Sequence, residues 1–184
     1  MAITIDGSGS VTGVSVGGLP DGIVDRDTLA TQAKGSILQV VSTTKTDHLS
    51  IQDGSGISGS PATIMSVAIT PTSTSSKILV ICNVNASCND ASLIYLFRDS
   101  TKIANGTSGN TANREGWAMP RQGASNECQN HSTSILDSPS TTSEITYTIK
   151  GLNESSSDAL RINRRESGTQ YGLFSNMVVM EVSA

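Results

Sequence analysis

The chain has 184 residues, of which 36% are hydrophobic and only 3% aromatic, and its formal net charge is −4 with an isoelectric point near 5.0. This length allows one domain with a sizeable core and an added arm. The acidic balance excludes a protein drawn by charge to nucleic acid or to an anionic membrane surface. Abundant Ser and Thr favour strands and turns over helices, so the composition predicts an all-β protein.

Residues 1–35 differ from the rest of the chain, and we expect them to form an extended N-terminal docking arm. The opening MAITIDGSGSVTGVSVGGLP is rich in Gly, and its isolated apolar side chains would have to be buried on a partner. One short helix is expected within residues 21–35, with Asp25 or Asp27 as its cap and Gly35 after its end. The residues expected to dock are Ile3, Ile5, Val11, Val14, Val16, Leu19, Ile23 and Leu29.

From residue 36 onward the pattern is β, and residues 36–184 are predicted to form a jelly-roll-like β-sandwich. The candidate strands are residues 37–44, 62–70, 77–86, 93–98, 132–136, 144–150, 159–163 and 176–182. The most apolar of them, 77–86, carries Ile78 and Val80 on one side and Leu79 and Ile81 on the other. We therefore expect this strand to be covered on both faces for at least half its length.

Residues 71–99 form the densest apolar region of the chain and are predicted to be its structural centre. Asn89 and Asp90 separate two apolar strands there, and both residue types favour turns. The expected element is a hairpin of 77–86 with 93–98, central to the sandwich.

The longest irregular region, residues 104–130, is predicted to be functional or to be ordered by a neighbour. It contains Arg114, Arg121 and the single tryptophan, Trp117. Together with Tyr171, these are the residues proposed for an outward contact, because Trp, Tyr and Arg are enriched at the energetic centres of interfaces. The alternative is that Trp117 and Tyr171 close the core.

The cysteines are not spaced as a disulfide scaffold. Cys82 and Cys88 are too far apart on an extended strand to bridge, and are expected to be small core residues, with Cys128 a loop thiol. A signal peptide is not expected, because the N-terminus MAITIDGSGS has no basic region followed by an apolar run. A membrane-spanning segment is not expected either, because no run approaches about 20 apolar residues.

Two glycine motifs have weak catalytic or nucleotide-binding interpretations. Residues 13–17, GVSVG, match a nucleophile elbow, but no helix or alternating strand and helix pattern follows. Residues 54–59, GSGISG, match a phosphate-binding loop, but Pro61 and a strand follow where a helix should begin. Both are better explained as glycine-rich connecting segments.

Metal and acid–base chemistry are also poorly supported. Cys128 and His131 supply two ligands, whereas a structural zinc site needs four. Asp137 and Glu144 flank one turn and could be the two carboxylates that a glycosidase needs. Sugar-binding grooves are lined with aromatic residues, and this chain has few, so capping and turn roles explain both acids better. No cofactor and no catalytic residue is expected. The basic run of Arg161, Arg164 and Arg165 has acids close by and is expected to be solvated or to pair across a subunit interface.

Four segments together resemble small structural proteins of tailed bacteriophages. They are residues 7–47, beginning GSGSVTGVSVGG, residues 69–87, ITPTSTSSKILVICNVNAS, residues 136–151, LDSPSTTSEITYTIKG, and residues 176–184, NMVVMEVSA. The resemblance implies a virion protein of the capsid-decorating (cement) or tail-fibre type. It also implies a jelly-roll domain similar to those that trimerise in the manner of tumour necrosis factor domains.

The first interpretation is a non-enzymatic, homotrimeric capsid-decorating protein on the phage surface, bound to the major capsid protein or to a tail protein. The second is a short tail fibre or fibre tip that contacts host surface glycans through the loops around Trp117. A third, from a different class, is a polysaccharide-cleaving enzyme that uses Asp137 and Glu144.

Overall fold

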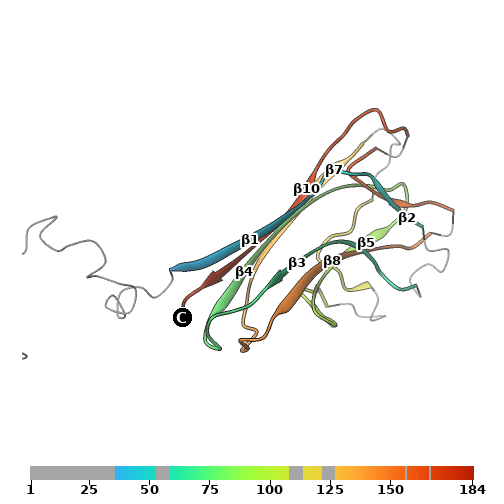
Figure 1. Cartoon of the computed structure of the whole chain (residues 1–184). Coiled ribbons are helices and arrows are strands. Elements are labelled where there is room, and N and C mark those ends of the chain that lie inside the picture. The colour runs from blue at the N-terminus through green and yellow to red at the C-terminus, as the bar shows by residue number, and fades with distance from the viewer. Residues whose placement is uncertain (1–35, 53–58, 108–113, 122–126, 156, 166) are drawn as a thin grey trace, which may run out of the picture. The chain divides into compact units, whose positions relative to one another are not determined.

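The computed structural model describes residues 36–52, 59–107, 114–121, 127–155, 157–165 and 167–184 (Figure 1). The chain divides into two units, Met1–Lys34 and Gly35–Ala184. The predicted docking arm, its helix and the GVSVG motif lie outside the described residues, as does most of the GSGISG segment. No helix long and apolar enough to span a membrane was found in the part of the chain that the structure describes.

Two antiparallel sheets pack face to face in Gly35–Ala184. Sheet A contains, in spatial order, β1 (Ile37–Lys45), β10 (Ser175–Val182), β4 (Lys77–Ser87), β9 (Leu160–Ile162) and β2 (Leu49–Ile51), and β7 (Gln129–Asp137) also pairs with β4. Sheet B has the order β3 (Ala62–Ile69), β8 (Ile145–Asn153), β5 (Ser92–Arg98) and β6 (Thr101–Ile103). Figure 1 shows β1, β10, β4 and β7 in one layer and β3, β8 and β5 in the other.

The strand order is that of a jelly roll. Four strands, β1-β10-β4-β7, face four others, β3-β8-β5-β6, and consecutive long strands alternate between the layers. The predicted all-β jelly-roll fold is confirmed, and each predicted strand coincides with an observed one. Two strands of three residues each, β2 and β6, were not predicted, because three residues are too few to show an alternating pattern.

The predicted central hairpin is wrong, because β4 and β5 belong to different sheets. The Asn89 and Asp90 segment between them crosses from one layer to the other. Both backbone N–H groups donate hydrogen bonds to the carboxylate of Asp158, at 2.9 and 3.1 Å. The two turn-forming residues therefore change the chain's direction as expected. The crossing is held in place by Asp158, which is distant in sequence, and not by strand pairing between β4 and β5.

The core lies between the inner faces of the sheets. The inward residues of β4 are completely buried: Ile78, Val80, Cys82, Val84 and Ala86. They belong to one apolar cluster with residues of sheet B that include Leu96, Tyr147 and Ile149. Cys82 and Cys88 are buried core residues as predicted, and all three cysteines are free thiols.

Gly151 in β8 gives a direct test of how tightly the sheets pack. A Cβ atom there would lie 2.6 Å from Cδ2 of Leu160 and 2.9 Å from Cδ1 of Ile51. We expect Gly151→Val to lower the free energy of unfolding by about 1–3 kcal/mol, as overpacked cores do, measured by urea denaturation. Gly172→Ala is the control, since no atom lies within 4 Å of its added Cβ. Equal stability of the two variants would contradict this account of the core.

One end of sheet A carries a row of polar residues on its inner face. Register places Gln39, Glu181, Ile78 and Asp137 side by side on β1, β10, β4 and β7. The two acids in this row are largely removed from water: Glu181 is fully buried, and the side chain of Asp137 is 13% exposed. Each acid accepts hydrogen bonds from a different neighbouring segment, so hydrogen bonds close this end of the sandwich.

Glu181 fixes the chain between β3 and β4. Its Oε1 atom accepts hydrogen bonds from the backbone N–H and the Oγ1 hydroxyl of Thr72, both at 2.7 Å. Its Oε2 atom accepts one from Nε2 of Gln39 at 2.6 Å, and that amide also donates to the carbonyl of Thr70 at 2.7 Å. Burial alone would raise the pKa of Glu181, but these hydrogen bonds outweigh it and lower the pKa to about 2.

Asp137 joins the two sheets. Both of its carboxylate oxygens accept hydrogen bonds from Nη1 of Arg98 in β5, at 2.8 Å each. The hydroxyl of Tyr147 in β8 donates to Oδ2 at 2.7 Å. Burial raises the pKa of Tyr147, and the hydrogen bond to Asp137 raises it further, so the phenol keeps its proton. The predicted capping or turn role of Asp137 is therefore corrected to a link between sheets.

Candidate functional site

The residues predicted for an outward contact come from two places in the fold. Residues 114–121 run beside β5, where the backbone N–H of Trp117 donates to the carbonyl of Ile94 at 3.0 Å. Arg114 forms an ion pair with Glu154 at 3.4 Å, and Arg121 is exposed. Tyr171 instead precedes β10 of sheet A. The four residues thus belong to two segments of the fold, one beside sheet B and one that leads into sheet A.

Trp117 and Tyr171 have different environments. Trp117 is half-buried and packs against the core cluster, as the alternative interpretation expected. Tyr171 is 56% exposed, and the guanidinium carbon of Arg165 lies 4.4 Å from its ring centroid. Leu173 and Phe174 follow and are 37% and 60% exposed. Tyr171 is therefore available to a partner, whereas replacing Trp117 would also disturb packing.

The residues considered for catalysis or metal binding are not assembled for it. Asp137 is engaged by Arg98 and Tyr147, while Glu144 is exposed in the turn before β8. In the described part of the chain, no three His, Cys, Asp or Glu residues lie close enough to hold a metal ion. Nothing in these contacts supports the polysaccharide-cleaving interpretation.

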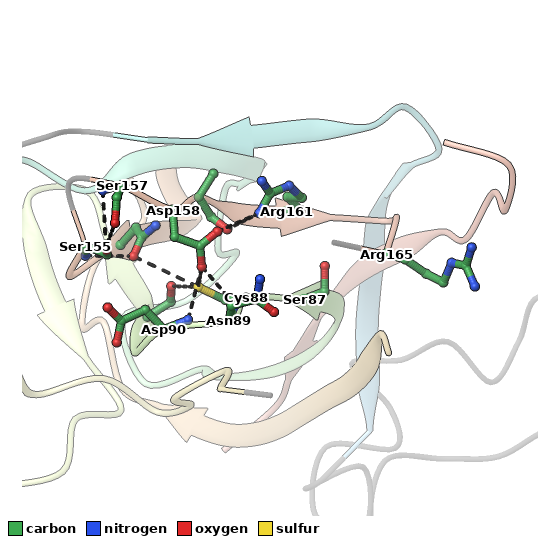
Figure 2. A network of polar contacts seen from close by, with 12 residues as sticks. Ser87, Cys88, Asn89, Asp90, Ser155, Ser157, Asp158, Arg161 and Arg165 are labelled. Atoms are coloured by element: carbon green, nitrogen blue, oxygen red, sulfur yellow. Dashed lines mark hydrogen bonds and ion pairs between the residues drawn. The ribbon is translucent and has the colours of Figure 1, made fainter. Parts of the chain in front are cut away.

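A polar cluster surrounds Asp158 beside the crossing from β4 to β5 (Figure 2). Besides the N–H groups of Asn89 and Asp90, Asp158 Oδ2 accepts the Cys88 thiol at 3.3 Å. Its Oδ1 atom accepts Nη1 of Arg161 at 3.0 Å. The cluster borders an open polar depression of about 420 Å³, which is lined by Asn89, Asp90, Ser155, Ser157, Asp158 and Arg161.

The chemistry of this Asp158 cluster is structural. Burial raises the pKa of the Cys88 thiol to about 11, so the reactive thiolate is scarce at neutral pH. Burial would also raise the pKa of Asp158, but the hydrogen bonds from Arg161 and its other donors outweigh it and lower that pKa, which keeps the carboxylate charged. The cluster contains no histidine that could act as a base. An ionised acceptor that binds two consecutive backbone N–H groups is instead suited to holding the crossing segment.

Asp158→Asn is expected to lower the free energy of unfolding by about 1–3 kcal/mol, since an amide accepts fewer hydrogen bonds than a carboxylate. It is also expected to increase the rate at which a thiol reagent modifies Cys88, because the crossing would open more often. Asp90→Asn is the matched control, since Oδ1 of Asp90 accepts the adjacent N–H of Ala91 and not an N–H of the crossing's distant partner. Unchanged labelling and stability in Asp158→Asn would show that the carboxylate does not hold the crossing.

The outward face of sheet A is the feature most suited to binding another protein. Pairing aligns residues of four neighbouring strands, β1, β10, β4 and β7, in three rows, which together we call the outer patch. In that strand order the rows are Val40, Met180, Leu79 and Leu136; Ser42, Val178, Ile81 and Ser134; and Thr44, Asn176, Asn83 and Ser132. No residue of the outer patch is charged, and six of the eight in its first two rows are apolar.

The apolar part of the outer patch remains accessible in the single chain. Val40 and Leu136, at the two ends of the first row, are 56% and 60% exposed. Leu79 and Ile81 are half-buried, so the prediction that β4 is covered on both faces holds fully only for its inner face. Solvent-facing positions of an antiparallel sheet are usually polar, which makes this aliphatic surface a candidate binding surface.

No protein-family model matches the chain, and no curated protein matches it. Among solved structures, one similar chain comes from "Structure of infectious bursal disease virus Gx strain", with a TM-score of 0.36 and 14% sequence identity. The similarity covers 79% of this chain and 41% of the viral chain, so this chain spans less than half of that protein's length. At this level the likeness is a distant one of β-rich, jelly-roll-like folds.

Sequence reasoning identified only part of the outer patch. It recognised Leu79 and Ile81 on the second face of one strand, but not Val40, Leu136 or Met180. A signal was present in residues 177–180, where Met, Val, Val and Met occupy both faces of β10. The other members depend on strand pairing between segments distant in sequence, which the string itself does not display.

Proposed function

We propose that the protein is a non-enzymatic structural protein of a phage particle, a trimeric capsid-decorating protein on the particle surface. The observation that carries this proposal is the uncharged, partly exposed aliphatic surface on sheet A, which suits a protein that works by assembling with other proteins. The resemblance of its sequence blocks to small virion proteins supports the particle as the place of assembly. The jelly-roll fold agrees with the same interpretation.

In this proposal residues 1–35 dock on the particle, through the aliphatic residues from Ile3 to Leu29 named above, and the β-sandwich stays outside. Each docking segment would contribute modest affinity. Three segments on one trimer gain through effective concentration, because after the first has bound the others are held close to their sites. Decoration of this kind would brace neighbouring shell subunits without any chemical step.

The copy number of the chain in purified particles tests the proposal. Quantitative mass spectrometry against the major capsid protein is expected to give hundreds of copies, in a simple ratio to the shell subunit. A few to a few tens of copies would favour a tail fibre instead. Absence from the particle would exclude both roles.

Deleting residues 1–30 is expected to abolish particle binding and to leave the β-sandwich folded, because every described strand lies after residue 35. Co-sedimentation with undecorated particles measures binding, and circular dichroism measures folding. Retained binding would contradict the docking role, and loss of folding would contradict the separation of the chain at about residue 35.

The second candidate is a short tail fibre or fibre tip, and the exposed residues Tyr171 and Phe174 favour it, since accessible aromatic rings suit contact with glycans or proteins. In that case, Tyr171→Ala is expected to reduce binding of the purified protein to host cells. Met119→Ala is a matched control, because Met119 is 60% exposed on the other segment. Trp117→Ala would be less informative, because Trp117 packs against the core.

A further inference from the structure

The two sheets differ in how far their outward apolar side chains are exposed to solvent. On sheet B, Leu93, Tyr95 and Leu152 form a second cluster and are 5%, 1% and 0% exposed. The ammonium groups of Lys102 and Lys150 lie 5.0 and 4.5 Å from the ring centroids of Tyr95 and Phe97. Sheet B therefore covers its outward apolar surface with its own chain and presents charge to water.

Among the residues that the structure describes, sheet A has no equivalent cover over the first row of the outer patch. Val40 and Leu136 are more than half exposed, at 56% and 60%. Lys77, which lies beyond that row on β4, donates to Oγ of Ser138 at 2.8 Å. The twelve positions of the outer patch carry no charge, in a chain with 12 basic and 16 acidic residues. Depletion of charge distinguishes the centre of a protein interface from ordinary surface.

We infer that the outer patch is the surface through which copies of this chain associate with one another. This inference rests on the proposed function, in which the protein works by assembly, and it adds which surface assembles and with which partner. The occupant of the outer patch is a second copy of the chain, whose own apolar residues meet Val40, Leu79 and Leu136.

Charge favours an identical partner. Each copy carries a formal net charge of −4, so two copies repel unless they meet through a neutral surface. Symmetric copies bring the same patch together around their axis, in a trimer as in a dimer, so a charged patch would face its own sign there, whereas a neutral aliphatic patch would not. The neighbouring polar row, with Thr44, Asn83 and Asn176, supplies donors and acceptors that can pair with the same groups on another copy.

Size also agrees with a self-contact. The outer patch is part of the whole outward face of these four strands, and four strands at about 4.8 Å and nine residues at about 3.4 Å give that face dimensions of roughly 19 by 30 Å. This is roughly 600 Å² per copy, the lower end of the area that stable protein interfaces bury on each partner. β1 and β7, the outermost of these four strands, contribute nine residues each. Flat sheet faces pack on one another at about 10 Å when their side chains are aliphatic, as in the sandwich itself.

The test is the oligomeric state of the full-length protein by sedimentation equilibrium over a range of concentrations. The wild-type protein is expected at a mass of at least twice the 19.1 kDa of one chain. The double variant Val40→Asp with Leu136→Asp is expected to raise the dissociation constant by about 100-fold or more, since it opposes like charges at a contact that was neutral. Both positions are exposed, so the core is not altered.

Two further variants separate association from folding. Ser66→Asp with Ala68→Asp adds the same charge to exposed, outward positions of β3 on sheet B, and is expected to leave the wild-type mass unchanged. Val40→Thr with Leu136→Thr adds no charge and places a β-branched residue, which suits a strand, at both positions. It is expected to weaken association by about 10-fold through loss of buried apolar area.

A monomeric wild-type chain, or an aspartate variant that keeps the wild-type mass, would overturn the inference. A monomer whose binding to particles is lost in the aspartate variant would assign the outer patch to a particle protein instead. Self-association that depends on the outer patch, in a protein that is absent from particles, would uphold the inference and refute the proposed function. The two failures are thus distinguishable.

Discussion

Replacing Asp137 with alanine is expected to lower the free energy of unfolding by about 3–5 kcal/mol, the cost of removing one partner from a largely buried charged pair. The side chains of Asp137 and Arg98 are 13% and 26% exposed. The variant would leave the guanidinium without its carboxylate and the hydroxyl of the fully buried Tyr147 without its acceptor. These groups belong to sheet B, whereas Asp137 belongs to sheet A, so the loss loosens the packing of one sheet on the other.

Urea denaturation at pH 7 measures this effect, and Glu144→Ala is the matched control because Glu144 is exposed in the following turn. Adding Arg98→Met to Asp137→Ala is expected to recover part of the loss, since the uncompensated charge is then removed as well. If Asp137→Ala and Glu144→Ala were equally stable, the link between the sheets would contribute little to folding.

Glu181→Ala is expected to cost about 2–4 kcal/mol, because the N–H of Thr72 and the amide of Gln39 each lose an acceptor, at about 1–3 kcal/mol for an unsatisfied buried donor. Glu181→Gln should cost less, because its amide oxygen still accepts one of these bonds. The segment between β3 and β4 is the part expected to loosen, so hydrogen exchange at Thr72 should increase more than exchange in β8.

The pKa of Glu181 adds a pH dependence with a definite sign. The pKa is about 2 in the folded chain against an ordinary 4.5, so the folded carboxylate binds its proton less readily than the unfolded one. Its contribution to stability is fully present above the unfolded pKa and is lost as the pH falls from about 5 towards about 2. The free energy of unfolding, measured from pH 7 to pH 2, should therefore fall more steeply for the wild type than for Glu181→Gln. Parallel curves would contradict the assignment.

The sequence predicted the strands of this fold better than their pairing. Alternation in segments such as Lys77–Ser87 marks the inward residues directly, and those residues form the core. The hairpin prediction failed because Asn89 and Asp90 indicate a change of direction but not the sheet to which the chain goes. Asp158, which holds the crossing, is 69 and 68 positions away from them. Contacts over such separations leave no local pattern.

The same reason limits what could be predicted about function. Glu181 reads as a lone acid in an apolar strand, and its partner Thr72 is 109 positions away. The outer patch combines residues from four strands. The sequence indicated only Leu79 and Ile81 of β4, because that strand is apolar on both faces. The predicted docking residues from Ile3 to Leu29 lie outside the described residues, and their role stays a prediction.

The position of β10 constrains when the protein can assemble during its synthesis. Of the described strands, β10 is the last in sequence, yet it lies between β1, the first of them, and β4. While the ribosome is still making the chain, β1 and β4 have no strand between them, and Val178 and Met180 are missing from the surface proposed to bind other copies. A nascent or prematurely terminated chain would therefore lack both a closed sheet and a complete self-contact. Because β10 lies inside the sheet, between β1 and β4, assembly is restricted to chains translated through Val182.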